Sequence, residues 1–246
     1  MTISSRGGTA NSVGSTSTTL TLPTGQSAGD LLFAIIRVGS SAAQTWSQSG
    51  GTGTWTKQYD AADSAGGYSY TVWWRVMAGG DTAPTFSWTT STTVTWACGG
   101  FFSSTGGTLS IDTWATELDT GTSSNSVTPN PATAAGSGEA SIILSCARAA
   151  TETTPASHTY TAPTGWTLPS GGDVWIGSAN SRWSATVYQL GLSGTVTPGA
   201  ETLTDASSGA YFFSVAHALV TETAAAGATP APLVVPQAAV MQAANW

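Results

Sequence analysis

The side chains that could carry chemistry are few and widely spaced along this sequence. Histidine occurs twice: His158 lies in a Ser/Thr-rich loop, and His217 lies in a predicted strand at 214–218. A histidine beside a serine could activate a nucleophile, but serine is so frequent here that such a pairing is expected by chance. No Gly-x-Ser-x-Gly turn joins a strand to a helix. We therefore expect no hydrolase triad and no enzymatic activity.

Carboxylates offer another route to catalysis, because a glycosidase needs two of them about 5–10 Å apart across a cleft. Most acids here fall at predicted turns, where Asx-type hydrogen bonds explain them; these are Asp30, Asp60, Asp63, Asp81, Asp173 and Asp205. Asp30 and Glu139 form a notable pair, since each follows a glycine and opens an apolar run. A repeated structural role explains that pair more economically than catalysis. The spacing of Cys and His predicts no metal site, and no cofactor is expected.

Tryptophan is unusually frequent, with 11 residues in the chain. Exposed tryptophans can stack on sugar faces, and the candidates for that role are Trp46, Trp74 and Trp175. Tryptophan also fills cores and anchors interfaces, which is the interpretation we favour for most of the set. Trp73 and Trp74 are adjacent, so in a strand their side chains should lie on opposite faces.

Charge and cysteine content limit the partners. Lys and Arg total 6 against 13 acids, which gives a net charge of −7. With no basic patch to neutralise phosphates, nucleic acid is not expected as a partner. Cys98 and Cys146 lie in predicted buried strands and are interpreted as small apolar fillers. A disulfide between them is the alternative.

Targeting signals are not apparent in the sequence. Residues 1–14 contain one arginine and no apolar segment of the signal-peptide type. The apolar runs are far shorter than the ~20 residues that span a bilayer. We expect a product made in the cytoplasm, without membrane insertion.

Strand patterns occur throughout the chain, and no segment shows a sustained 3.6-residue period. The predicted strands of the first half are 18–22, 29–38, 54–59, 68–77, 85–88, 92–102 and 109–118. A second set matches them in order, at 127–129, 138–149, 163–168, 184–190, 201–204 and 210–220. The runs 29–38 and 138–149 are predicted to be buried on both faces. The conserved order of these matches predicts an internal repeat.

This pattern predicts an all-β fold, a jelly-roll-like β-sandwich built from two sequence-similar halves with extended N- and C-terminal arms. The predicted divisions are an arm at 1–16, a first β repeat at 17–118, a linker at 119–134, a second β repeat at 135–220 and a Pro/Ala-rich arm at 221–246. The halves could form two domains or one sandwich. In the C-terminal arm the candidate assembly contacts are Leu233, Val234, Val235 and Trp246, since such side chains suit solvent poorly; the alternative is a loose tail.

Short motifs recur in both halves. The first half has Ala-Gly-Asp-Leu-Leu at 28–32, Trp-Thr at 55–56, Thr-Val-Trp-Trp-Arg-Val at 71–76 and Pro-Thr-Phe-Ser-Trp at 84–88, and the second has Thr-Ala-Pro-Thr-Gly-Trp-Thr at 161–167. These motifs resemble a recurrent β-domain of tailed-bacteriophage structural proteins, whose Ala-Pro-x-Gly-Trp-Thr turn becomes Gly-Thr-Trp-Thr at 53–56. The resemblance implies a protein of the tail or head surface, with no catalytic residues to carry over.

Taken together, these features predict a non-enzymatic virion structural protein, a minor tail or head-decoration component present in several copies. Its expected partners are other virion proteins and copies of itself. The alternative is a host-surface carbohydrate-binding module that uses exposed tryptophans for adhesion.

Overall fold

The fold of the chain is all-β, as the sequence predicts. The computed structural model describes residues 3–63, 67–115, 118–119, 123–149, 158–176, 182–205 and 210–225. Strands and turns make up this described part, which contains no helix. The assembly contacts predicted at Leu233, Val234, Val235 and Trp246 lie outside the described residues.

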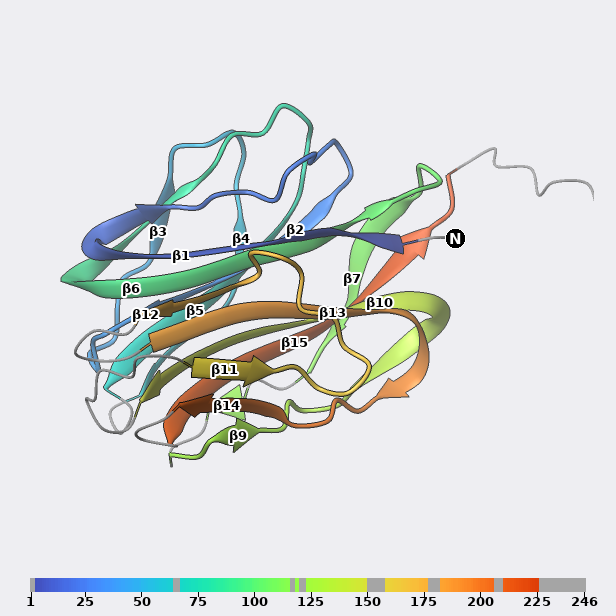
Figure 1. The fold of residues 1–246 in the computed structure, drawn as a ribbon. Helices are drawn as coiled ribbons and strands as arrows, with labels where there is room; N and C mark the ends of the chain where they lie inside the picture. The colour runs from blue at the N-terminus through green and yellow to red at the C-terminus, as the bar shows by residue number, and fades with distance from the viewer. Residues whose placement is uncertain are drawn as a thin grey trace, which may run out of the picture.

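The first large sheet is antiparallel and has the strand order β1–β6–β2–β5–β4, with β3 paired to the N-terminal part of β6 (Figure 1). Its strands are β1 (Ile3–Thr19), β2 (Leu31–Val38), β3 (Ser47–Ser49), β4 (Thr56–Asp63), β5 (Tyr68–Val76) and β6 (Thr85–Ser103). All of β2 is buried, as expected for a strand in the middle of a sheet covered on both faces.

The second large sheet has the order β12–β13–β10–β15–β7, with β8 paired to β15. Its strands are β7 (Thr108–Trp114), β8 (Leu118–Asp119), β10 (Ala132–Ala149), β12 (Asp173–Ile176), β13 (Arg182–Val196) and β15 (Tyr211–Thr223). A small third sheet lies beneath it in Figure 1 and has the order β11–β14–β9. Its strands are β9 (Ser126–Val127), β11 (His158–Thr161) and β14 (Glu201–Asp205).

The two large sheets follow the same path. In the first, β2 lies between β5 and β6; in the second, β10 lies between β13 and β15. The registers also agree. Leu31 is paired with Val76 and Phe101, while Ala140 is paired with Leu190 and Val220 in the matching strands. This agreement is what a repeat would produce, although the duplication itself stays a prediction.

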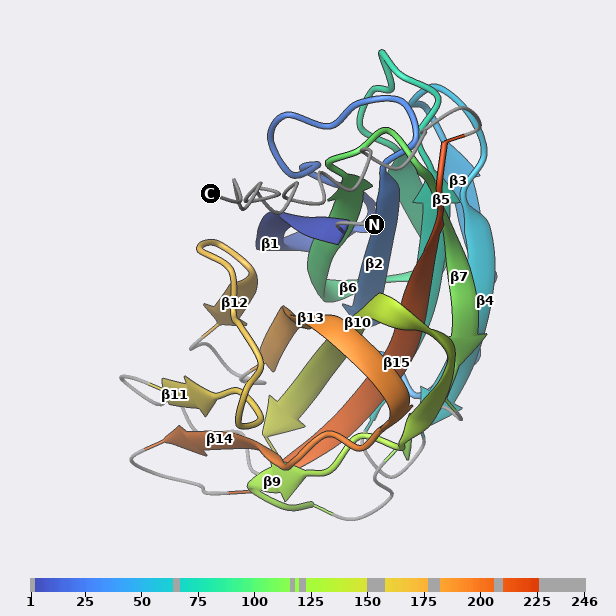
Figure 2. The ribbon, with the colours of Figure 1, turned by 90° about the vertical axis from the view of Figure 1, so that its right-hand side faces the viewer.

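The core is layered, and the period of two along each central strand builds it. Leu31, Phe33 and Ile35 of β2 face β10 across the space between the two large sheets, where they meet Ile142 and Leu144. The intervening residues of β2 face a second core on the outer side of their sheet. A third core lies between the second large sheet and the small sheet. Figure 2 shows the two large sheets side by side with the small sheet below.

Buried polar contacts join the two halves. Arg37 of β2 is fully buried, donates from Nη1 to the Ala147 carbonyl at 3.0 Å and stacks 3.9 Å above the Tyr68 ring. Arg182 of β13 donates in the other direction to the Thr93 carbonyl. The halves thus share one core and one polar network.

The prediction of an extended N-terminal arm at 1–16 is wrong for its described residues, 3–16, which belong to a strand. Ile3–Thr19 is a strand that pairs with β6 along its whole length, from Ile3 opposite Ser103 to Thr19 opposite Thr85. The sequence is rich in Gly, Ser and Thr, so its backbone hydrogen bonds rather than apolar alternation hold it in the sheet. The chain before 118 also reaches into the second sheet, because β7 pairs with β15. The predicted linker 119–134 contains β9 and the start of β10.

Both cysteines are buried and neither forms a disulfide, which confirms their interpretation as small apolar side chains in the core. Cys98 belongs to the outer core of the first sheet and Cys146 to the core between the sheets. Burial raises the pKa of the Cys98 thiol.

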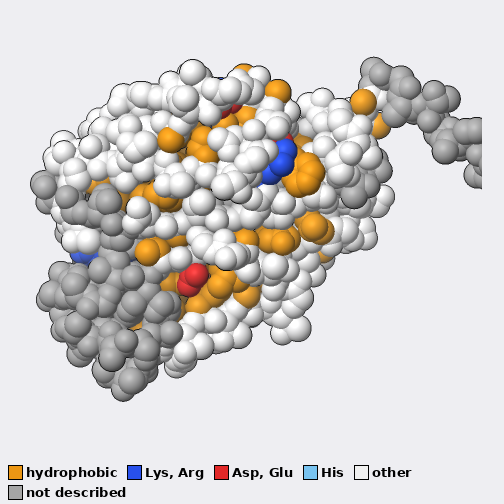
Figure 3. All heavy atoms as spheres, turned by 45° about the horizontal axis from the view of Figure 1, so that its top comes forward, with side chains coloured by type: hydrophobic (Ala, Val, Ile, Leu, Met, Phe, Trp, Pro, Cys, Tyr) orange, Lys and Arg blue, Asp and Glu red, His pale blue; other side chains and the backbone are white. Residues whose placement is uncertain are grey.

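Few charges reach the surface. On the face shown in Figure 3, charged side chains are scattered singly among uncharged ones. No helix in the described part of the chain is long and apolar enough to span a membrane.

Candidate functional site

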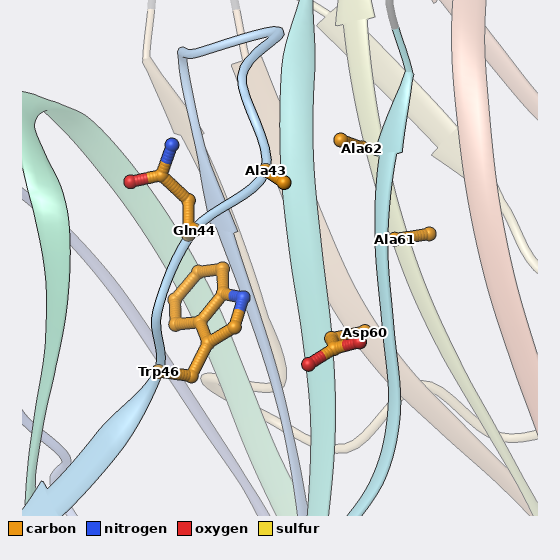
Figure 4. A pocket seen from close by; sticks show the side chains of 6 residues that line it. All are labelled: Ala43, Gln44, Trp46, Asp60, Ala61 and Ala62. Carbon is orange, nitrogen blue, oxygen red and sulfur yellow. The ribbon is translucent and has the colours of Figure 1, made fainter.

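A small pocket beside β4 contains one of the predicted sugar-binding tryptophans. It is lined by Ala43, Gln44, Trp46, Asp60, Ala61 and Ala62 and has a volume of about 140 Å³. In Figure 4 the Trp46 indole and the Asp60 carboxylate both lie toward this space, one from the loop before β3 and the other from β4. We call it the Trp46 pocket. An aromatic wall opposite a carboxylate is an arrangement that can hold the edge of one sugar ring, although drug-sized ligands need larger pockets.

Two neighbours fix the walls of the Trp46 pocket. Trp46 is only 9% exposed and packs against Trp88, with ring centroids 5.9 Å apart. Gln44 is held by its own loop and by β6, since its Nε2 donates to the Ser40 hydroxyl at 3.1 Å and its Oε1 accepts the N–H of Thr90 in β6 at 3.0 Å. Asp60 remains open to solvent and forms an ion pair with Lys57.

The other two tryptophans in the prediction do not join Trp46. Trp74 is half-buried and packs against the core between the large sheets, with its indole N–H buried and without a partner among the described residues. Trp73 lies on the opposite face with Trp46, as the alternation of a strand predicts. Trp175 belongs to β12, but its side chain lies outside the described part of the structure.

A serine and a histidine do meet, as the abundance of serine led us to expect by chance. His217 Nδ1 donates to the Asn130 carbonyl at 2.7 Å, which leaves Nε2 to accept the Ser141 hydroxyl at 2.7 Å. Ser141 is 0% exposed and His217 1%. Burial lowers the pKa of His217, against the effect of its bond to Asn130. A substrate carbonyl cannot reach this serine, so the pair holds β10 to β15.

Glu201 is a buried carboxylate whose pKa is strongly raised. It lies fully buried on β14 and accepts the Ser145 hydroxyl at 2.7 Å. Burial raises its pKa to about 7, and the hydroxyls of Ser145 and Tyr160 partly oppose that rise. Sequence reasoning missed this group, because only the packing of the small sheet, which contains β14, against β10 buries it. Its position in a closed core assigns it to folding rather than to a reaction.

Asp81 has the structural role expected of an acid in a turn. Asp81 accepts the Ala78 N–H at 2.7 Å and forms a buried ion pair with Arg75 at 2.7 Å. Four acids differ from the prediction of turns: Asp60 and Asp63 lie in strand β4, Asp173 begins β12 and Asp205 ends β14.

A second pocket of about 330 Å³ lies where β2 begins, beside the turn between β6 and β7. Arg6 and Asp30 line it, and they neutralise each other through hydrogen bonds of 2.7 and 3.1 Å. Hydroxyl groups of Ser27, Ser103 and Thr108 complete the polar lining.

Comparison with known proteins adds no relative. No protein-family model, no curated protein and no solved structure matches this chain.

Proposed function

We propose that this chain is a non-enzymatic structural protein of a tailed-bacteriophage particle, a minor tail or head-decoration component that acts through assembly contacts. The observation that supports it best is the use of buried polar groups to join the two halves. Arg37 reaches the Ala147 carbonyl across the shared core, and Tyr68 donates to the Phe213 carbonyl at 3.3 Å. Such contacts make a stiff body suited to repeated assembly.

The groups that could do chemistry support the same proposal. The Ser141–His217 pair and Glu201 are all closed off from solvent. A general base or nucleophile must reach its substrate within hydrogen-bonding distance, which these positions do not allow. The sequence resemblance to phage structural proteins also supports a structural role. It implies that the protein is located in the virion and that its partners are other virion proteins and further copies of this chain.

Truncation of the C-terminal arm tests the proposal. Deleting residues 230–246 removes Leu233, Val234, Val235 and Trp246 while leaving every described residue in place. We expect a truncated protein with an unchanged thermal unfolding midpoint that fails to enter assembled particles. A full-length variant with those four side chains changed to serine is the matched control for chain length, and it should fail in the same way. Particles that carry the truncated protein at full occupancy would contradict the assembly role of the arm.

The Trp46 pocket favours a second function, adhesion to host-surface glycans. The pocket places an aromatic side wall opposite the exposed carboxylate of Asp60. On a glycan array, a specific ligand should be lost in Asp60→Asn. Lys57→Gln breaks the same ion pair but keeps the carboxylate, and it should still bind. Equal binding by both variants, or no binding by the unmodified chain, would exclude this pocket as a glycan site.

A further inference from the structure

The Trp46 pocket is small and mostly apolar, and it lies beside β4, an edge strand of the first sheet. Alanine methyl groups of Ala43, Ala61 and Ala62 contribute to its lining, and the Trp46 indole forms one wall (Figure 4). Its volume of about 140 Å³ is well below that of a site for a drug-sized ligand, so it has room for one small ring. Such a pocket suits an apolar ring better than a chain of hydroxylated sugars.

The polar groups around the pocket are mostly engaged already. Gln44 is bound in its loop, where its Nε2 also donates to the Ala42 carbonyl at 2.6 Å. The Asp60 carboxylate pairs with Lys57. In Figure 4 the ring nitrogen of Trp46 lies on the side that faces β4, so its N–H can donate to a carbonyl of an occupant. An aromatic wall of this kind is typical of sites that recognise proline-rich segments.

The chain itself carries an uncharged, proline-rich segment, which lies outside the described residues. Residues 230–236 read Pro-Ala-Pro-Leu-Val-Val-Pro, and none of the 13 acids or 6 basic residues lies beyond Glu222. Prolines lack the N–H that strand addition at the edge of β4 would require. They favour instead an extended helix without internal hydrogen bonds, which is the form that aromatic grooves bind. An uncharged segment can also approach a protein of net charge −7 without repulsion.

The pocket and the end of β15 lie toward opposite ends of the first sheet. Glu222, near the end of β15, accepts the hydroxyl of Ser103, the last residue of β6. Ala62 of the pocket lies in the cross-strand row of Val94, which is nine residues earlier on β6 and thus about 30 Å away. The seven residues from the end of β15 to Pro230 span at most about 25 Å. Pro230 of the same chain therefore falls short of the pocket, whereas a neighbouring copy can present it.

We propose that the Trp46 pocket binds residues 230–232 of a neighbouring copy of this chain, with one proline ring against the Trp46 indole. The inference rests on the proposed assembly role of the C-terminal arm and gives that arm a docking site. The contact joins different surfaces of the two copies, so it is heterologous and continues into a ring or a filament. Each copy uses its pocket once and its proline segment once.

Self-association of the full chain tests the contact. In sedimentation velocity, the mass of the unmodified chain should rise with its concentration. Ala43→Arg places a long side chain in the pocket from an exposed loop position, and it should weaken association by about tenfold or more. Ala42→Arg is the matched control, because it adds the same side chain at the neighbouring exposed position, which does not line the pocket. It should associate normally, and both variants should keep the thermal unfolding midpoint of the unmodified chain.

A mixing experiment tests the direction of the contact. Changing Pro230 and Pro232 to alanine removes the rings of the segment and keeps the pocket, whereas Ala43→Arg blocks the pocket and keeps the segment. Each variant alone should stay monomeric. The two together should form a one-to-one dimer and nothing larger, because only one intact pocket and one intact segment can meet.

Three results would overturn the inference: a mass of one chain at every concentration, normal association of Ala43→Arg, or mixed variants that stay monomeric. Loss of glycan binding in Ala43→Arg with unchanged self-association would assign the pocket to a sugar instead, which also overturns it.

Incorporation into particles separates this docking site from the proposed function. If Ala43→Arg enters particles normally while the chain truncated at 230 is excluded, the assembly role of the arm stands and the docking site fails. If the chain self-associates as expected but the truncated protein enters particles at full occupancy, the docking site stands and the assembly role fails.

Discussion

Asp30 and Glu139 accept the same backbone hydrogen bond in the two halves of the protein. Asp30 accepts the Ser27 N–H at 2.7 Å, and Glu139 accepts the Gly136 N–H at 2.7 Å, each from three residues earlier. The glycine before each acid has a φ of 87° or 76°, a backbone conformation that residues with a Cβ rarely adopt. The Gly-acid motif therefore precedes β2 in the first sheet, and in β10 it precedes the stretch from Ala140 onward that pairs with β15.

The contact of Tyr68 with β15 predicts a loss of stability in Tyr68→Phe. The hydroxyl is fully buried, donates to the Phe213 carbonyl and accepts the Ser214 hydroxyl at 2.9 Å. Removing it leaves buried polar groups without their partner, so the free energy of unfolding should fall by about 1–3 kcal/mol. Urea unfolding measures the change. Lys57→Gln breaks only an exposed ion pair and should change stability by less than about 1 kcal/mol; equal effects in both variants would contradict the structure here.

Glu201 predicts a pH dependence of stability. Its pKa is about 7 in the fold and 4.5 as the ordinary value, so the folded state holds the proton more tightly than the unfolded one. The contribution of the protonated Glu201 to the free energy of unfolding is therefore complete below pH 4.5 and is lost as the pH rises from 4.5 through 7. Glu201→Gln should be more stable than the unmodified chain at pH 8, by up to about 3 kcal/mol, and this difference should vanish near pH 4.

Urea unfolding of both proteins across this pH range checks the prediction about Glu201. The difference between them must be used, because His217 acts in the opposite direction. Burial lowers the pKa of His217 below 6.5, so its contribution is lost as pH falls through 6.5. Asp60→Asn, at an exposed site, is the control and should give a constant difference. If the free energy of unfolding of Glu201→Gln and of the unmodified chain changed with pH in parallel, the pKa of Glu201 would not be raised by folding, which would contradict the prediction.

The sequence predicted the central strands well, because a strand buried on both faces is recognisable from a run of mostly apolar residues. Continuous apolar residues at 31–38 and 140–147 reveal strands covered on both faces, and the structure places both there. Strand β1 left no such trace, since its residues are held by pairing with β6 at positions some 70 to 100 residues away. The same holds for the Ser141–His217 contact, whose partners are 76 residues apart. Only the topology brings them together.

Trp74 shows the same limit for the candidate site. The many tryptophans suggest surfaces on which sugars could stack. Successive side chains of a strand alternate between the two faces of the sheet, so Trp73 and Trp74 of β5 lie on opposite faces. Which face is covered depends on the packing of a second sheet, and that packing places Trp74 against the shared core. Trp46 reaches a pocket because its loop crosses beside β4, a relationship that neither residue spacing nor hydropathy contains.

The burial of both thiols predicts that the native protein resists thiol reagents. Cys98 and Cys146 are each 0% exposed, and burial raises the pKa of Cys98, so little thiolate forms at neutral pH. A chromogenic disulfide reagent should therefore detect no free thiol in the folded protein and 2 after unfolding in denaturant. Rapid labelling of the folded chain would contradict the burial of these strands, and fewer than 2 thiols in denaturant would mean that the cysteines form a disulfide.

The close approach of Gly99 to Thr186 predicts how the two halves fit together. Gly99 lies on β6 and Thr186 on β13, and a Cβ at Gly99 would meet the Thr186 Cγ2 methyl at 2.5 Å. Gly99→Ala should therefore destabilise the protein by about 1–3 kcal/mol, as overpacking of a core does. Thr186→Ser removes that methyl group and keeps the hydroxyl, so the double variant should recover most of the loss. Urea unfolding of the four proteins gives the coupling energy between the two sites. Additive effects would mean that β6 and β13 do not meet at these residues, whereas a favourable coupling of about 1 kcal/mol or more is expected from their contact.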